Sequence, residues 1–139
     1  MEKRVLKVTV DYTDRNFCGG IFDVTIGGVV LATGKTFELF KKEFEEGLRF
    51  HIQSNLERGE ILPEEIVNGN YEIVYELAVP ALLRDAERFT TLSAISKVSG
   101  INQKQLSHYV NGEKKARPDK REKIINGLHE IGRQALAFI

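Results

Sequence analysis

The chain has 139 residues, of which 42% are hydrophobic and 29% are charged, and its formal net charge is zero. This composition is that of an ordinary soluble globular protein and excludes a disordered chain, and no apolar run approaches the ~20 residues of a membrane span. The single cysteine, Cys18, excludes an intrachain disulfide, and with no signal-peptide pattern at the N-terminus it favours the reducing cytoplasm.

The neutral total conceals an uneven distribution of charge. Residues 1–80 carry nine Lys and Arg against fourteen Asp and Glu, a net charge of −5, whereas residues 81–139 carry eleven against six, a net charge of +5. Affinity for nucleic acid is therefore expected in the C-terminal part, and the N-terminal part suits a basic partner.

Three strands are predicted first. Apolar and polar residues alternate over residues 4–12, a second strand is expected over 17–26, and the apolar run over 29–32 continues as the third. The side chains expected to point inward from the first two are Leu6, Val8, Val10, Tyr12, Phe22, Val24 and Ile26. Cys18-Gly19-Gly20 indicates a bulge or bend, and Gly27-Gly28 is typical of a two-residue hairpin turn.

A long amphipathic helix and a fourth strand follow. Thr36 is the expected N-cap of the helix, whose apolar stripe consists of Phe37, Phe40, Phe44, Leu48, Ile52 and Leu56. Residues 71–79 alternate again, with Glu72 and Glu76 on the outward side. The order β-β-β-α-β predicts a small two-layer α+β domain over residues 1–79.

Carboxylates on this sheet raise the question of catalysis. By parity, four acids fall on the outward face: Asp11, Asp23, Glu72 and Glu76. Such a group is able to bind divalent metal in a nuclease, but the solvated face of a two-layer domain is the commoner explanation. Cys18 has no neighbouring His or Lys to lower its pKa. The sequence contains no catalytic constellation, so we expect no enzyme activity and no metal or other cofactor.

Two short helices joined by a tight turn are predicted between Thr91 and Gly112. Thr91 and Asn102 are the expected N-caps, and Gly100 supplies a left-handed residue that ends the first helix. This is the helix-turn-helix pattern. We expect it inside an all-α domain over residues 80–139, in which a helix over 81–88 precedes the pair and a helix from Pro118 follows it.

The stretch ISKVSGINQKQLSHYVNG at Ile95–Gly112 resembles repressors of the phage Cro/Xre type. In such domains the second helix enters the major groove of double-stranded DNA. The resemblance implies base contacts from Gln103, Lys104, Ser107 and His108, with Asn102 at the start of the same helix, and phosphate contacts from Asn111, Lys114, Lys115 and Arg117. Leu92 and Ser96 depart from the Gln and Ala that are common in the family.

The last helix carries a coiled-coil-like seam of Ile124, Leu128, Ile131, Ala135 and Phe138. This seam either packs within the domain or meets its twin in a homodimer. Because one recognition helix covers only a few base pairs, we expect a homodimer or a higher even oligomer on the operator.

The chain as a whole resembles the HicB family of antitoxins, through the order of its elements and through IGGVVLATGKTF at Ile26–Phe37. The resemblance implies a partial ribonuclease-H-like fold without nuclease activity, a small basic toxin that cleaves messenger RNA as partner, and repression of the operon. Charge complementarity suggests Glu72 and Glu76 as the toxin contacts. The alternative is a stand-alone transcriptional regulator whose N-terminal domain senses a ligand or dimerises.

Overall fold

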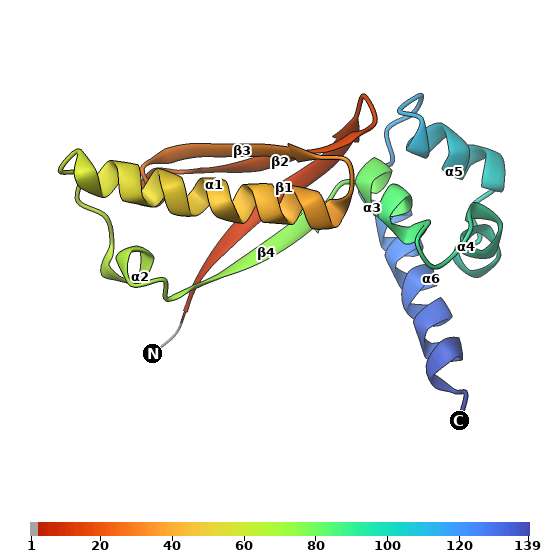
Figure 1. The fold of residues 1–139 in the computed structure, drawn as a ribbon. Helices are drawn as coiled ribbons and strands as arrows, with labels where there is room; N and C mark the ends of the chain where they lie inside the picture. Colours follow the sequence, from red (N-terminus) through yellow and green to blue (C-terminus); the bar gives the residue numbers. More distant parts are fainter. Residues whose placement is uncertain (1–2) are drawn as a thin grey trace. The chain divides into compact units, whose positions relative to one another are not determined.

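The chain forms two compact units, Met1–Ala78 and Val79–Ile139, in a computed structural model that describes residues 3–139 (Figure 1). This division lies one residue before the expected boundary between positions 79 and 80. No helix within the described part of the chain has both the length and the apolar composition that crossing a bilayer requires. The architecture is α+β, with a four-stranded sheet and helices α1 to α6.

Unit 1 contains the sheet. Its elements are β1 (Arg4–Thr13), β2 (Asn16–Asp23), the 3-10 turn η1 (Val24–Ile26), β3 (Gly28–Gly34), α1 (Phe37–Glu57), α2 (Glu64–Val67) and β4 (Tyr71–Leu77). The strand order is β3-β2-β1-β4, in which β2 is antiparallel to both of its neighbours and β4 is parallel to β1. β3 and β4 are therefore the two edge strands, and the short helix α2 was not anticipated from the sequence.

One face of the sheet is covered by α1, which runs along it in Figure 1. As predicted, Leu6, Val8 and Val10 are buried there, and the α1 stripe contributes Phe40, Phe44, Leu48 and Ile52. The Thr36 hydroxyl accepts a hydrogen bond from the Leu39 amide at 3.1 Å and caps α1 as expected. On the opposite face of the sheet, which we call the open face, Val5, Phe22, Leu31 and Val74 are exposed.

The prediction for the second strand was wrong at Phe22 and Val24, whereas Ile26 is buried as predicted. Phe22 follows the buried Ile21 within β2, so its side chain points to the opposite face and is 73% exposed. Val24 is 75% exposed because β2 has ended at Asp23 and the chain turns into η1. The Asp23 carboxylate caps that turn by accepting hydrogen bonds from the amide and the hydroxyl of Thr25, at 2.8 and 2.6 Å. It is therefore not one of the outward acids of the sheet, which was the second error here.

The glycines near the start of β2 do not form a bulge. Residues 17–23 pair one to one with β3, and a Cβ on Gly19 would collide with the carbonyl oxygen of Thr9 on β1. Close approach of the strands, rather than a bend, explains that glycine. The β2–β3 connection is η1 followed by Gly27 at φ 88°, not a two-residue turn.

Unit 2 consists of α3 (Val79–Ala86), α4 (Leu92–Ser99), α5 (Gln103–Val110) and α6 (Pro118–Leu136). Its core joins all four helices and the turn between α4 and α5: Val79, Leu83, Ala86, Ile95, Ile101, Leu106, Tyr109, Val110 and Ile124. On the α6 seam, Ile124 is buried and Leu128 and Ile131 pack against the core, whereas Ala135 and Phe138 are exposed. Only the first part of the seam is therefore used within the unit.

Candidate functional site

The pair α4–α5 is held in a fixed geometry by caps and by the turn between the helices. The Thr91 hydroxyl accepts from the Ala94 amide at 3.1 Å, and the Asn102 side chain accepts from the Lys104 amide at 2.7 Å, so both expected N-caps are confirmed. Gly100 adopts the left-handed conformation, with φ 74°. A side chain with a Cβ is strained at that φ, so the sharp turn depends on this glycine.

Ser96 fixes how closely the two helices approach. Its hydroxyl donates to the carbonyl of Ile101 at 2.6 Å, while the Ser99 hydroxyl accepts from the Ile101 amide at 3.2 Å. The Ile101 side chain is 2% exposed and fills the space below the turn. Ser96 therefore adds a hydrogen bond across the turn that an alanine side chain would lack.

The first turn of α5 presents polar side chains to solvent. Asn102, Gln103 and Lys104 are exposed, and Leu106, Tyr109 and Val110 form the buried side of the same helix. Packing of the buried side fixes how α5 is rotated about its own axis. The exposed side chains therefore stay on the solvent side of the helix. Gln105 is not among them, since its amide donates to the Tyr109 hydroxyl at 2.6 Å.

Two of the expected base readers are less accessible. Ser107 and His108 are half-buried, and the Nε2 atom of His108 lies 3.4 Å from a carboxylate oxygen of Glu113. That contact is an ion pair only when the imidazole is protonated. Gln103 and Lys104 are therefore more accessible than Ser107 and His108.

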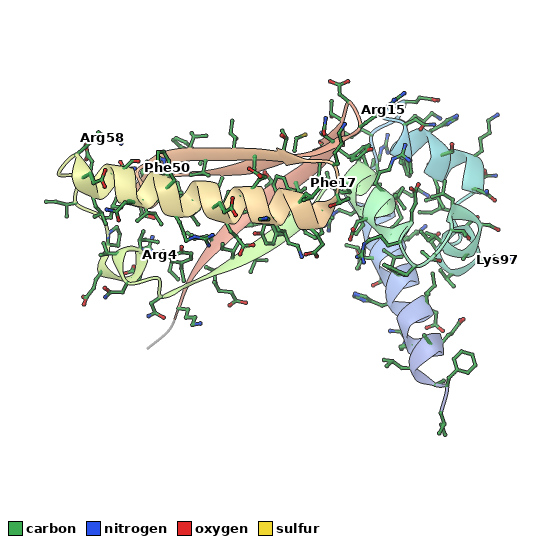
Figure 2. All side chains as sticks on the ribbon, in the orientation of Figure 1. Arg4, Arg15, Phe17, Phe50, Arg58 and Lys97 are labelled. Atoms are coloured by element: carbon green, nitrogen blue, oxygen red, sulfur yellow. The ribbon has the colours of Figure 1, made fainter. Side chains whose placement is uncertain are left out.

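Exposed basic side chains follow α5 in the sequence. Lys114, Lys115 and Arg117 follow α5 and are exposed, as is Asn111 at its C-cap. None of the three basic side chains, nor Lys104, has a carboxylate partner within residues 3–139. Unneutralised cations of this kind suit phosphate oxygens. A further exposed cation that the sequence reasoning did not consider is Lys97 on α4 (Figure 2).

The two expected toxin contacts lie on β4, which is an edge strand. Glu72 and Glu76 are both exposed and both on the open face, where they flank Val74. Glu76 pairs with Lys7 on the neighbouring strand at 2.5 Å, so its charge is partly neutralised. Glu72 has no ion-pair partner in the described part of the chain and is the more available acid.

The open face also carries an exposed apolar patch on β2 and β3, which the sequence did not predict. Phe22 of β2 stands opposite Val29 of β3, and Leu31 stands opposite Gly20; the exposed fractions of Phe22, Val29 and Leu31 are 73%, 49% and 74%. Counting alternation from Phe17 inward would have put Phe22 outward. The missed signal was the end of the strand at Asp23.

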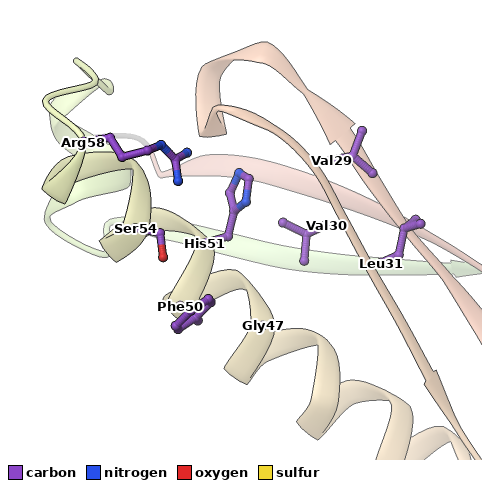
Figure 3. A pocket seen from close by; sticks show the side chains of 8 residues that line it. All are labelled: Val29, Val30, Leu31, Gly47, Phe50, His51, Ser54 and Arg58. Carbon is purple, nitrogen blue, oxygen red and sulfur yellow. The ribbon is translucent and has the colours of Figure 1, made fainter.

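A groove runs between β3 and α1, at the free edge of the sheet (Figure 3). It is lined by Val29, Val30, Leu31, Gly47, Phe50, His51, Ser54 and Arg58. Phe50 is 75% exposed and lies on the α1 side (Figures 2 and 3). Since Leu31 and Phe50 are both largely exposed, this is a surface groove and not an enclosed cavity.

The acids and histidines do not gather into a metal site. No group of three or more His, Cys, Asp or Glu side chains in residues 3–139 is placed to hold a metal ion. Asp11 is exposed on the open face, but the Asp23 carboxylate accepts a hydrogen bond from the Thr25 amide within its own turn. The pKa of the Cys18 thiol is raised by burial and by the nearby Asp11 carboxylate, which makes it a weaker nucleophile.

No protein-family model matches this chain, and neither does any curated protein or any solved structure.

Proposed function

We propose that this protein is the antitoxin of a toxin–antitoxin pair, with unit 2 repressing the operon and unit 1 neutralising a small, basic, RNA-cleaving toxin. The observation that carries the proposal is the α4–α5 pair: a capped second helix whose exposed first turn bears Gln103 and Lys104, followed by cations without carboxylate partners. In this proposal unit 2 is a helix-turn-helix domain of the Cro/Xre type and α5 is its recognition helix.

The exposed first turn of α5 supports the proposed DNA binding. An α-helix fits the major groove, where glutamine makes paired hydrogen bonds to adenine. Gln103 and Lys104 read the base edges, with Ser107 and His108 further along the helix. Asn111, Lys114, Lys115 and Arg117 hold phosphates, which position the helix without adding sequence selectivity.

Unit 1 is the toxin-binding part in this proposal. Its net charge of −5 complements the basic surface that an RNA-cleaving toxin must present, and such complementarity speeds association. The antiparallel strands β1 to β3, helix α1 and the return strand β4 support a partial ribonuclease-H-like fold. The exposed groove beside β3 is not an enclosed ligand cavity, so it gives no support to the ligand-sensing alternative.

Gln103→Ala and Lys115→Ala test the DNA-binding half. Loss of one bidentate base contact weakens specific binding by about 1–3 kcal/mol and leaves binding to scrambled DNA nearly unchanged. Loss of a phosphate contact weakens both alike and reduces the salt slope by about one unit. Equal loss on both DNAs for Gln103→Ala would remove α5 as the reading helix.

A charge reversal in the full chain tests the toxin-binding half. Glu72→Lys with Glu76→Lys is compared with Glu43→Lys and Glu46→Lys, which makes the same change of charge at exposed positions on α1. The β4 pair is expected to slow association with the product of a neighbouring small basic gene and to abolish growth rescue, while operator binding survives. Equal behaviour of both double variants would show that β4 is not the contact.

A further inference from the structure

The β3 edge of the sheet lacks the features that usually keep sheet edges apart. β3 consists of GVVLATG, with no charged residue and no proline, and among residues 3–139 β2 is its only strand neighbour. The opposite edge, β4, carries Glu72 and Glu76. Proteins commonly protect edge strands with charges, proline or bulges, because unpaired backbone groups template further pairing. The unprotected β3 edge is therefore suited to accept another strand.

Exposed apolar side chains lie on both sides of that edge. Leu31 and Val29 project on the open face next to Phe22, and on the other face Phe50 of α1 borders the groove. A strand added beside β3 would cover Leu31 on one face and enter the groove on the other. The exposed apolar surface is thus continuous around the β3 edge.

Gly47 is a second and independent observation, from the middle of α1. A Cβ at this position would meet only the Val30 side chain, at an ordinary contact distance of 3.8 Å. Packing within the chain does not require glycine there, although glycine weakens a helix interior. Because Gly47 lines the groove, its small size leaves room for a second helix to approach α1.

We propose that β3 pairs antiparallel with β3 of a second copy of this chain, about a twofold axis at Leu31. Leu31 then meets its equivalent, and Val29 faces Thr33 of the other copy. An antiparallel pair with this symmetry forms a continuous eight-stranded sheet and keeps both α1 helices on one face, near Gly47. Such a contact is isologous, the usual arrangement of a homodimer.

The charges around the β3 edge favour a second copy of the chain over a basic partner as the molecule that binds there. The groove and the edge contain no carboxylate, and their ionisable side chains are His51 and Arg58. A basic toxin finds no counter-charge here, whereas an uncharged strand pairs with its own copy without leaving a buried charge. The proposal stands without the proposed function, since it concerns only the association of unit 1.

The test is the mass of the full chain in solution, measured by light scattering and sedimentation. The wild type is expected at twice the 15.7 kDa chain mass. Leu31→Lys places a charge on the edge and is expected to give a monomer with an unchanged circular dichroism spectrum, because the side chain is largely exposed. Val5→Lys is the matched control: Val5 is 57% exposed on the same face but lies on the interior strand β1, so this variant stays dimeric.

A cross-link keeps the test decisive if Leu31→Lys misfolds. In a Cys18→Ser background, Leu31→Cys is expected to form a disulfide-linked dimer under mild oxidation, because directly opposed residues of antiparallel strands lie within disulfide range. Val5→Cys in the same background should not. A monomeric wild type, a dimer that survives Leu31→Lys, or failure of Leu31→Cys to cross-link would each overturn the proposal. Loss of the dimer in Val5→Lys would also do so, by indicating face-to-face packing.

Discussion

Two interior glycines of α6 provide a matched test of how closely α4 and α6 pack. A Cβ on Gly127 would lie 3.0 Å from the Val98 Cγ2 atom and 3.3 Å from both the Cβ and the backbone nitrogen of Ser99. A Cβ on Gly132 would meet nothing within 4 Å. The same substitution by alanine therefore has two different structural consequences within one helix.

The expected magnitudes follow from these distances. Alanine in place of glycine in a helix interior favours the folded state by up to about 1 kcal/mol at either position. At Gly127 the added methyl group overlaps the backbone of Ser99, which cannot rotate away, and overpacking of this kind costs about 1–3 kcal/mol. Gly132→Ala is therefore expected to stabilise unit 2, whereas Gly127→Ala is neutral or destabilising.

Hydrogen exchange of the α4 amides is the appropriate measurement, because it reports the opening of unit 2 without a contribution from unit 1. The two variants should differ by about 1–3 kcal/mol in the free energy of opening, with Gly127→Ala the less protected. Equal protection in both variants would refute the close α4–α6 contact, and with it the explanation for a glycine at position 127.

Three further outcomes are expected. Gly47→Ala, made in the Leu31→Lys chain so that association does not contribute, should raise the free energy of unfolding by about 1 kcal/mol in urea. The pKa of Glu65 is lowered by its own backbone amide and by Arg4, whose guanidinium lies 2.7 Å away, so this carboxylate stabilises the fold above its unfolded pKa of about 4.3 and the stabilisation is lost as the pH falls through the lower folded value. The gap in urea midpoint between wild type and Glu65→Gln should therefore be largest near neutral pH and should close in acid. Leu106→Ala removes a fully buried side chain and should cost unit 2 about 2–5 kcal/mol and abolish operator binding.

Local patterns predicted most of the elements, because their causes are local. Alternation placed β1 and β4, the spacing of apolar residues placed the buried stripe of α1, and Thr36, Thr91 and Asn102 each cap the helix they were expected to cap. The error at Phe22 arose where alternation was continued through a turn that the Asp23 cap begins. Asp23 followed by Thr25 indicates a turn. The apolar residues on either side of Asp23 indicate a strand instead, so the two local patterns predict different structures.

The features that the sequence did not predict depend on tertiary contacts. That β3 has a free edge depends on β4 pairing with β1 on the other side of the sheet, and no pattern within β3 determines this. Likewise, the Glu113 carboxylate beside His108 and the Lys7–Glu76 ion pair come from side-chain placement. The candidate DNA-contact residues were predicted by position alone, and their exposure ranks Gln103 and Lys104 ahead of Ser107 and His108.

The β3 contact and the proposed recognition helix make a joint prediction about the operator. One helix reads only a few base pairs, so two copies should bind a near-palindrome whose half-sites lie about 34–36 Å apart, or a multiple of that distance.

Leu31→Lys changes unit 1 alone and should keep its affinity for an isolated half-site. On the full palindrome it should lose cooperativity, with a Hill coefficient that falls from about two towards one, while Val5→Lys behaves as the wild type. Isotherms on both DNAs provide the measurement. If Leu31→Lys binds the palindrome as cooperatively as the wild type does, the copies are held together on DNA by another contact, and the exposed end of α6 around Phe138 becomes the surface to test.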